Sequence, residues 1–376
     1  MIYRTIYMSI KDSLFKGKAI LLFGSRQVGK TTITEQLAKD YEGQTLILDC
    51  DEPDVRGLLE NVTSTQLKSV IGAHKVLIID EAQRVKNIGI TLKLIVDKIK
   101  NVQVVATGSS ALDMASEINE SLTGRKYEYF VHPFSVEELS SHTTWLEEAR
   151  NLEYRLIFGM YPDITKNPTD AERLLRNLTS SYLYKDLLAF EDVRKPDLLQ
   201  KLTQALALQV GSEVSYSELA RTLMVDKSTI SKYIDLLEKA FIIFKLNAFS
   251  RNHRSELTTT KKIYFWDNGV RNAVISNFNR TGQRTDIGPL WENFMISERI
   301  KHTQNNLKYC KYYFWRTKMQ QEIDLIEEQN NALRAFEFKW NEKSRSYIPK
   351  TFTDTYYVEE IGLINKSNYR KYLGEK

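Results

Sequence analysis

A glycine-rich turn constrains this chain more than any other stretch. It runs from Gly24 to Thr32, reads Gly-Ser-Arg-Gln-Val-Gly-Lys-Thr-Thr, and directly follows the apolar run at 19–23. Glycines let a backbone curl closely around an anion, and the N–H groups in the first turn of a following helix point at that anion. An amphipathic segment begins at Ile33. The pattern therefore predicts a buried strand, a phosphate-binding loop and a helix in succession.

The spacing of the loop, G-x-x-x-x-G-K-T, assigns roles to its last residues. The ammonium group of Lys30 would lie beside the β- and γ-phosphates, and the hydroxyl of Thr31 would join the coordination shell of Mg²⁺. ATP and Mg²⁺ are the expected cofactors. The expected nucleotide-binding residues are Gly24, Ser25, Arg26, Gln27, Val28, Gly29, Lys30, Thr31 and Thr32.

Further short apolar runs, at 45–49, 75–79 and 103–107, alternate with helical segments. This alternation predicts a buried parallel sheet. The run at 75–79 leads into Asp80 and Glu81. Asp80 can accept a hydrogen bond from a water of the magnesium shell, and Glu81 can polarise the water that attacks the γ-phosphate. The two carboxylates would complete a nucleotide hydrolysis site.

Two more candidates follow along the chain. The hydroxyl of Ser109, just after the run at 103–107, would lie near the catalytic water or the γ-phosphate, with a helix-capping serine as the alternative. Arg125 precedes an alternating strand at 127–131 and is the candidate for stabilising charge in phosphoryl transfer. It would act within its own subunit or across the interface of a homo-oligomer, and a surface ion pair is the alternative.

Composition fits a globular protein of two or three domains, with 376 residues, of which 27% are charged and 42% hydrophobic. No apolar stretch approaches the roughly 20 residues of a membrane span, and the N-terminus lacks an apolar signal core, so the cytoplasm is expected and no membrane partner. Cys50 and Cys310 form no ligand-like spacing with the histidines. Residues 1–140 hold 17 Lys and Arg against 18 Asp and Glu, and the remainder holds 36 against 30. An excess this small does not decide whether the partner is a polyanion.

The stretch 136–208 is helical in pattern and is expected to be a lid or linker. A capping box at Ser215 then opens a short helix through 223, and Asp226 caps a second helix at 227–239, which is helix-turn-helix spacing. Strands at 241–246 and 262–266 would complete a winged helix. The residues expected to contact DNA are Lys227, Ser228, Thr229 and Lys232 in the major groove, and Arg251 and Arg254 at phosphates. A winged helix used only for packing is the alternative.

Two charged runs near the C-terminus, 322–325 and 335–340, predict a hairpin with a polar turn at 327–331. Period-two geometry places Glu337 and Lys339 on one face of their strand. Asp324 and Glu337 could converge on Mg²⁺ with Lys339 beside them to orient a water, and Glu292 on a helix at 291–299 could complete the metal shell. That chemistry suits phosphodiester cleavage, but solvated strand faces carry the same residues, so both interpretations stay open.

The chain resembles bacterial and archaeal ATPases of the AAA superfamily. The resemblance rests on the loop at 24–32, Ile-Asp-Glu-Ala-Gln at 79–83, Thr-Gly-Ser-Ser at 107–110, and Leu-Thr-Gly-Arg at 122–125 leading to His-Pro-Phe-Ser at 132–135. It implies a five-stranded core in which the strands carrying the phosphate loop and Asp80 flank the strand ending in Thr107. It also implies a C-terminal region like the PD-(D/E)xK restriction endonucleases, with marks at Glu292, Asp324, Glu337 and Lys339.

The expected fold is therefore α/β, with a P-loop (AAA/ASCE type) parallel-sheet ATPase domain at 1–140, a helical lid or linker at 141–208, a winged helix-turn-helix at 209–268 and a restriction-endonuclease-like α/β domain at 269–376. The expected function is magnesium-dependent ATP hydrolysis coupled to DNA binding and a nuclease-like domain. The alternative is a nucleotide-gated regulatory module that binds DNA or a protein without cutting. The expected catalytic residues are Lys30, Glu81, Ser109, Arg125, Asp324, Glu337 and Lys339, and the expected metal ligands are Thr31, Asp80, Glu292, Asp324 and Glu337.

Overall fold

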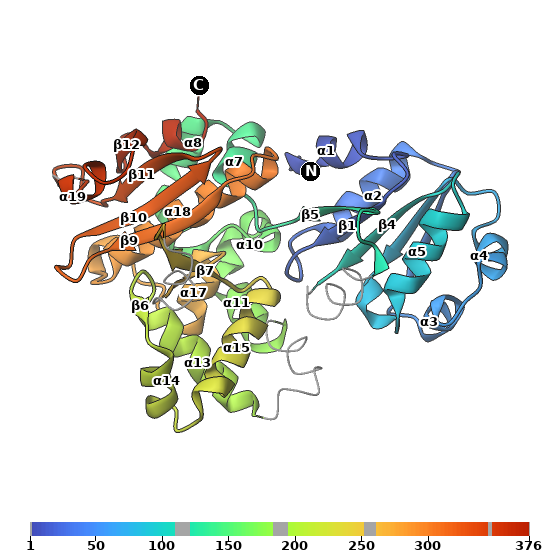
Figure 1. Cartoon of the computed structure of the whole chain (residues 1–376), viewed down its shortest axis with the longest axis horizontal. Coiled ribbons are helices and arrows are strands. Elements are labelled where there is room, and N and C mark those ends of the chain that lie inside the picture. The colour runs from blue at the N-terminus through green and yellow to red at the C-terminus, as the bar shows by residue number, and fades with distance from the viewer. Residues whose placement is uncertain (1, 110–120, 183–194, 252–260, 345–347, 376) are drawn as a thin grey trace. The chain divides into compact units, whose positions relative to one another are not determined.

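A computed structural model describes residues 2–109, 121–182, 195–251, 261–344 and 348–375 of the chain (Figure 1). The chain divides into two compact units. Unit 1 comprises residues 3–132 with 239–241, and unit 2 comprises residues 133–238 with 242–376. Within the described ranges, no helix combines the length and the apolar character needed to cross a bilayer.

Unit 1 is built on a five-stranded parallel sheet in the order β2-β3-β4-β1-β5. Its strands are β1 (Ala19–Phe23), β2 (Thr45–Asp49), β3 (Val76–Asp80), β4 (Gln103–Gly108) and β5 (Lys126–Phe130). Every residue of β1 and β4 is buried, as expected for central strands read as continuous apolar runs. β4, which carries Thr107, lies between β3 and β1. The strand order implied by the resemblance is confirmed.

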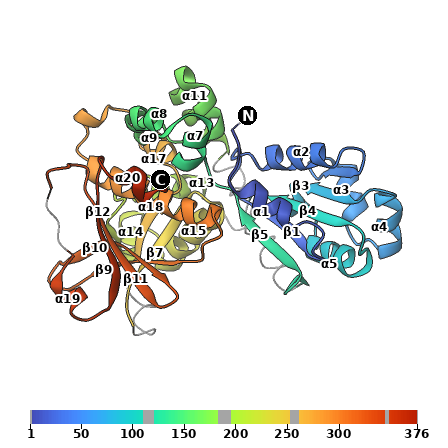
Figure 2. The ribbon, with the colours of Figure 1, turned by 90° about the horizontal axis from the view of Figure 1, so that it is seen from above.

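Helices cover both sides of this sheet (Figure 2). They are α1 (Ile6–Asp12), α2 (Lys30–Asp40), α3 (Pro53–Leu59), α4 (Ser64–Ile71), the 3₁₀ turn η1 (Ala82–Arg84) and α5 (Ile88–Lys98). The chain crosses the sheet in one direction from β1 to β2 and in the other direction from β3 to β4. Because both crossovers are right-handed, α2 and α5 lie on opposite sides.

Unit 2 contains a seven-stranded mixed sheet in the order β12-β11-β10-β9-β7-β8-β6. Its strands are β6 (Glu213–Val214), β7 (Ile243–Ala248), β8 (Lys261–Phe265), β9 (Lys311–Arg316), β10 (Glu322–Gln329), β11 (Ala332–Phe338) and β12 (Val358–Ile364). β7 pairs with β8 in antiparallel and with β9 in parallel. The sheet therefore runs without a break across the domain boundary expected at 268/269.

The helical segments of unit 2 are short apart from three. In chain order they are α7 (Val136–His142), α8 (Trp145–Arg150), α9 (Leu152–Phe158), α10 (Pro162–Lys166), η2 (Pro168–Asp170), α11 (Ala171–Asn177), η3 (Leu178–Tyr182), α13 (Pro196–Leu208), α14 (Tyr216–Thr222), α15 (Lys227–Lys239), α17 (Asn268–Val274), η4 (Thr281–Gln283), α18 (Ile287–Asn305), α19 (Lys350–Thr353) and α20 (Tyr369–Tyr372). α14 and α15 begin and end within a residue of the two helices predicted for the helix-turn-helix.

The strands β9 to β12 are covered on two faces (Figure 2). On one face, Phe352 of α19 packs with Phe249, Ile323 and Leu333 in an apolar cluster. On the other face lies α18, whose Arg299 forms a bidentate ion pair with Glu327 of β10, at 2.6 Å and 3.0 Å. α18 is therefore a core helix, buried along most of its length.

The C-terminal hairpin is present, but its turn is shorter than predicted. β10 extends through Gln329, so that only Asn330 and Asn331 connect it to β11. Both asparagines have positive φ, 52° and 66°, the backbone that a two-residue hairpin turn requires. Glu327, predicted in the turn, lies instead in the strand and is buried against Arg299.

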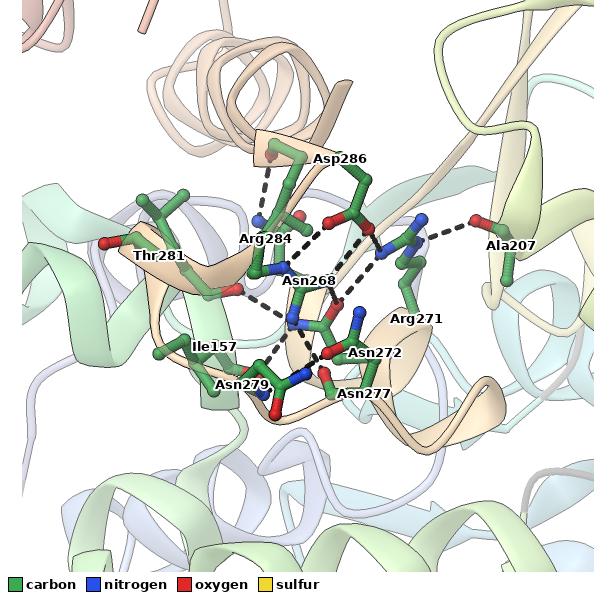
Figure 3. A network of polar contacts seen from close by, with 12 residues as sticks. Ile157, Ala207, Asn268, Arg271, Asn272, Asn277, Asn279, Thr281, Arg284 and Asp286 are labelled. Atoms are coloured by element: carbon green, nitrogen blue, oxygen red, sulfur yellow. Dashed lines mark hydrogen bonds and ion pairs between the residues drawn. The ribbon is translucent and has the colours of Figure 1, made fainter. Parts of the chain in front are cut away.

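A buried polar network joins segments that the sequence assigns to two different domains, 141–208 and 269–376 (Figure 3). Arg271 and Arg284 both bind the carboxylate of Asp286, with N–O distances of 2.5 Å and 2.9 Å. The Arg271 Nε also donates to the carbonyl of Ala207, and Asn272 donates to the carbonyl of Ile157 at 2.8 Å. These bonds hold α9, α13 and α17 together, which explains why unit 2 is one compact body.

Candidate functional site

The loop of unit 1 has the backbone that a phosphate cradle needs. A Cβ at Gly24 would lie 2.0 Å from the carbonyl oxygen of Val131, so only glycine fits there. Gly29 has a φ of +97° and stands just before α2. A side chain at either glycine would alter the path of the loop. The helix that follows begins at Lys30, as the spacing predicts.

The ammonium group of Lys30 is turned into the loop. Its Nζ donates to the carbonyl oxygens of Gly24 and Ser25, each at 2.9 Å. Lys30, Ser25 and Val28 are buried, whereas Gln27 is exposed at the tip of the loop. The loop therefore already holds a positive charge at its centre, next to the first N–H groups of α2.

The hydroxyl of Thr31 and the carboxylate of Asp80 lie side by side at the C-terminal edge of the sheet. Thr31 Oγ1 donates to Asp80 Oδ2 at 3.3 Å, and Thr107 Oγ1 donates to Asp80 Oδ1. Thr107 Oγ1 in turn accepts the backbone N–H of Glu81 at 3.1 Å. A hydroxyl beside a carboxylate is a donor set that suits Mg²⁺, so these residues fit the expected metal.

Glu81 is held by contacts that the sequence alone did not reveal. Its backbone is left-handed, with φ 50° and ψ 41°, and places it at the start of η1. The side-chain amide of Gln83 lies 2.5 Å from Glu81 Oε2 and 3.0 Å from Ser109 Oγ. Gln83 and Thr107 belong to the quoted signatures, but their bonding depends on the neighbouring β3 and β4. The structure thus brings Ser109 and Glu81 together through Gln83.

Arg125 lies at the N-terminal ends of the strands, whereas the phosphate loop lies at their C-terminal ends. The carbonyl of Arg125 accepts the N–H of Ala19, the first residue of β1, whereas the phosphate loop follows the last residue of that strand. A five-residue strand separates the two ends by about 13 Å, at about 3.3 Å per residue. Arg125 Nε instead forms an ion pair with Asp97 at 2.8 Å. Action on its own subunit's phosphate loop is therefore out of reach, and action across an interface stays a prediction.

The charged residues predicted near the C-terminus do gather in unit 2, but they gather around lysines. Lys339 Nζ lies 2.8 Å from Glu337 Oε2 and 3.6 Å from Asp324 Oδ2. Asp324 Oδ2 also accepts the backbone N–H of Phe338 at 2.8 Å. Glu292, on α18, contacts a second lysine, Lys262, at 3.0 Å. Within the ranges that the structure describes, no group of three or more His, Cys, Asp or Glu is arranged to hold a metal ion.

Lys262 and Tyr264 are site residues that the sequence reasoning missed. Both lie on β8, expected to be part of the wing, and both contact Glu292 Oε1, at 3.0 Å and 2.6 Å. Burial, followed by the nearby Asp324 carboxylate, raises the pKa of Glu292 to about 7. No signal in the sequence pointed to Lys262, because its proximity to Glu292 depends on how α18 packs on β8.

α18 is fixed on β8 by the residue after Glu292. The side-chain oxygen of Asn293 accepts the N–H of Phe265 at 2.7 Å, and its amide donates to the carbonyl of the same residue at 3.0 Å. Asn293 is fully buried. This two-way pairing sets the register of the helix on the strand and therefore places Glu292 over Lys262.

The face predicted to read DNA lies on the first half of α15. Lys227, Ser228 and Lys232 are exposed and Thr229 is half-buried. A cavity of about 390 Å³ opens beside them, lined by residues that include Lys195, Met224, Asp226 and Thr229. Arg251 is exposed and its guanidinium lies 3.9 Å from Glu328. Arg254 and Ser110 lie outside the described residues.

Three family profiles match successive parts of the chain. Residues 16–140 match an AAA domain, residues 149–281 match a domain of unknown function (DUF8612), and residues 287–375 match another domain of unknown function (DUF4143). Together these matches cover both compact units.

Similar whole proteins come from bacteria and archaea. An uncharacterized protein of Mycobacterium tuberculosis is 26% identical over 342 residues, which span 88% of this chain and 72% of that protein. An uncharacterized protein of Methanocaldococcus jannaschii is 24% identical over 301 residues, spanning 69% of this chain and 63% of its own length. Among solved structures, the Walker-type ATPase PABY2304 of Pyrococcus abyssi is 16% identical and covers 72% of this chain and 94% of its own, with a TM-score of 0.45.

The profile match at 16–140 covers the strand β1, the loop at 24–32 and the Asp80–Glu81 pair at the end of β3. A parallel sheet, a glycine-rich loop and a carboxylate pair at the C-terminal edge are what a nucleotide site of this class requires. Residues 16–140 thus match an AAA domain and carry the parallel sheet, the glycine-rich loop and the carboxylate pair of a P-loop nucleotide site.

Proposed function

We propose that this protein is a magnesium-dependent ATPase. The observation that carries the proposal is the arrangement of Lys30, Thr31, Asp80 and Glu81 at one edge of the five-stranded sheet, with Thr31 bonded to Asp80 at 3.3 Å. The parallel strands β1 and β3 end at the same edge, which brings the loop after one beside the carboxylates after the other.

Each residue of this site has its own role in the proposed reaction. The N–H groups at the start of α2 and the ammonium group of Lys30 bind and neutralise the β- and γ-phosphates. Thr31 and Asp80 would hold Mg²⁺, which supplies further charge neutralisation when bound. Glu81 accepts the proton of the attacking water, and Gln83 orients the Glu81 carboxylate.

Two substitutions test the ATPase. Lys30→Ala should abolish turnover, and Glu81→Gln should leave ATP binding intact while slowing phosphate release by about 10²-fold or more. Lys39→Ala and Glu35→Gln, both exposed on α2, are matched controls with the same change in charge. Phosphate release that is unchanged in both site variants would refute the proposal.

We further propose that unit 2 binds DNA and that the nucleotide state of unit 1 controls this binding. The exposed lysines at the start of α15 support a winged-helix contact with DNA. ATP turnover measured with and without DNA tests the coupling. Turnover that DNA does not alter would refute it.

For the C-terminal carboxylates, the contacts favour binding without cleavage over a nuclease. Lys262, which was not among the expected nuclease residues, forms an ion pair with Glu292, a carboxylate that cleavage would need as a metal ligand. The test is metal-dependent nicking of plasmid and single-stranded DNA by the wild type beside Asp324→Ala and Lys339→Ala. Nicking by the wild type that both substitutions abolish would establish a nuclease instead.

A further inference from the structure

Four carboxylates gather in unit 2, and we call them the carboxylate cluster: Glu292, Glu322, Asp324 and Glu337. The cluster contains a buried lysine, Lys262. Only 1% of the Lys262 side chain is exposed. Its Nζ pairs with Glu292 at 3.0 Å and also with Glu322, and it lies 5.5 Å from the centre of the Phe314 ring. A buried ammonium group with two carboxylate partners and an aromatic neighbour is fixed in place by all of them.

The carboxylate of Glu292 is likewise fixed in place, by two hydrogen bonds from β8. The same oxygen, Oε1, accepts from Tyr264 at 2.6 Å and from Lys262 at 3.0 Å. Its Oε2 faces the turn at Gly211, where an added Cβ would lie 3.4 Å away. The carboxylate is therefore enclosed by β8 and by this turn, with its charge balanced by Lys262.

The ammonium group of Lys262 is held between carboxylates from two different elements, Glu292 of α18 and Glu322 of β10. Removing one member of such a buried ion pair leaves the other as an uncompensated buried charge. The cluster thus contains its own cation.

We propose that Lys262 is the resident cation of this cluster and takes the place of the divalent metal that the Asp324, Glu337 and Glu292 carboxylates would otherwise bind. Mg²⁺ prefers six oxygens in octahedral geometry, whereas the oxygens here accept from Lys262, Tyr264, Lys339 and the Phe338 N–H. A second cation between these groups would face the unscreened repulsion of a buried ammonium group.

The consequence is that this site holds unit 2 together instead of cutting a phosphodiester. Lys262 comes from β8, Glu292 from α18 and Glu322 from β10, so the cation joins three elements that are distant in the chain. The inference concerns unit 2 alone and does not depend on ATP hydrolysis by unit 1.

The test compares metal binding with and without the lysine, in full-length protein carrying Asp80→Asn so that the site at Thr31 and Asp80 does not contribute. The parent should bind no Mn²⁺ at the C-terminal cluster, and its midpoint of thermal unfolding should not respond to millimolar Mn²⁺. Lys262→Met should unfold at lower temperature, and Mn²⁺ should raise its midpoint by about 5 °C while NaCl of equal ionic strength should not. Lys371→Met, which removes an exposed lysine on α20, is the matched control and should gain no response to Mn²⁺.

Two outcomes overturn the proposal. One is stoichiometric Mn²⁺ binding by the parent that Asp324→Asn abolishes, which is decisive even if Lys262→Met fails to fold. The other is a folded Lys262→Met, or the milder Lys262→Gln, that gains no Mn²⁺ binding. Metal binding that appears only when Lys262 is replaced, and that Glu292→Gln then removes, supports it.

Discussion

The side-chain amide of Gln83 donates to the carboxylate of Glu81 over 2.5 Å. The same nitrogen lies 3.0 Å from Ser109 Oγ, so that the ends of β3 and β4 are joined across the candidate hydrolysis site. Thr107 of β4 also joins these two strands, because its hydroxyl donates to the Asp80 carboxylate and accepts the Glu81 N–H. The carboxylate expected to activate water is thus bound by Gln83 of η1, which is itself bonded to Ser109 at the end of β4.

Gln83→Ala should therefore lower kcat of ATP hydrolysis by between about 10- and 100-fold and leave KM for ATP unchanged. The reason is that the substitution frees the Glu81 side chain without altering the loop that binds phosphate, and misplacing a catalytic group costs rate rather than affinity. Steady-state phosphate release against ATP concentration measures both constants. Gln36→Ala on α2 is the control, and a raised KM with normal kcat would contradict a positioning role for Gln83.

A second prediction concerns Gly159, just after α9. Its φ is +70°, and an added Cβ would lie 2.0 Å from Asp267 Oδ1. Asp267 is buried, accepts the Met160 N–H at 2.7 Å, and caps α17 through the Val270 N–H. Gly159→Ala should destabilise unit 2 by about 2 kcal/mol or more, because it combines backbone strain with displaced hydrogen bonds.

Thermal unfolding measures the loss at Gly159. Gly282→Ala is the matched control, since an added Cβ there meets no atom within 4 Å and φ is not positive. Equal midpoint temperatures of unfolding for the two variants would mean that the Asp267 side chain shifts without a loss of stability.

Much of unit 1 is predictable from sequence because local patterns determine it. The strands β1 to β4 coincide with short apolar runs, and β5 coincides with the alternating run predicted at 127–131. The residue spacing of the loop between β1 and α2 is that of a phosphate-binding loop. The location of Arg125 could not be predicted in this way, since it depends on β5 running parallel to β1. Parallel pairing places the residue before the strand at the edge opposite the phosphate loop.

Unit 2 is less predictable, since its important contacts are between segments distant in the chain. The pairing of β7 with β9 makes the two strands of the expected wing part of a larger sheet, in which Lys262 lies beside Glu322. The alternation of residues in β11 predicted that Glu337 and Lys339 would meet, but nothing local indicated that a second lysine would bind Glu292.

The carboxylate of Asp286 should be essential to the stability of unit 2. It is the counter-charge for two buried guanidinium groups, those of Arg271 and Arg284 (Figure 3). Asp286→Asn leaves both cations unpaired and should cost about 3–5 kcal/mol. Asp170→Asn, which breaks an exposed pair with Arg173, should cost less than about 1 kcal/mol. Urea unfolding of the two variants measures the difference, and equal costs would contradict the role of the network.

Asp286 also predicts how stability depends on pH. Burial acts to raise its pKa, but the hydrogen bonds from Arg284 and Arg271 outweigh burial and lower the pKa below the ordinary value of 3.8. A lowered pKa in the folded state means that the stabilisation is complete above about pH 4 and is lost as the pH falls through the folded-state pKa. Asp286→Asn should remove this loss, so the stabilities of wild type and variant should converge in acid. A constant difference from pH 7 to pH 3 would show that Asp286 does not titrate in this way.

The proposed binding of DNA by unit 2 should depend on the basic residues near the start of α15 and on Arg251, which follows β7. We expect the triple variant Lys227→Ala, Lys232→Ala and Arg251→Ala to weaken binding and to flatten its dependence on salt, because every side chain that no longer neutralises a phosphate reduces the slope of log K against log salt by about one unit. Fluorescence anisotropy of labelled duplex over a range of NaCl concentrations measures both. Lys371→Ala, exposed on α20, controls for the loss of charge alone. Binding that the triple variant retains in full, with an unchanged salt slope, would direct the search to a protein partner.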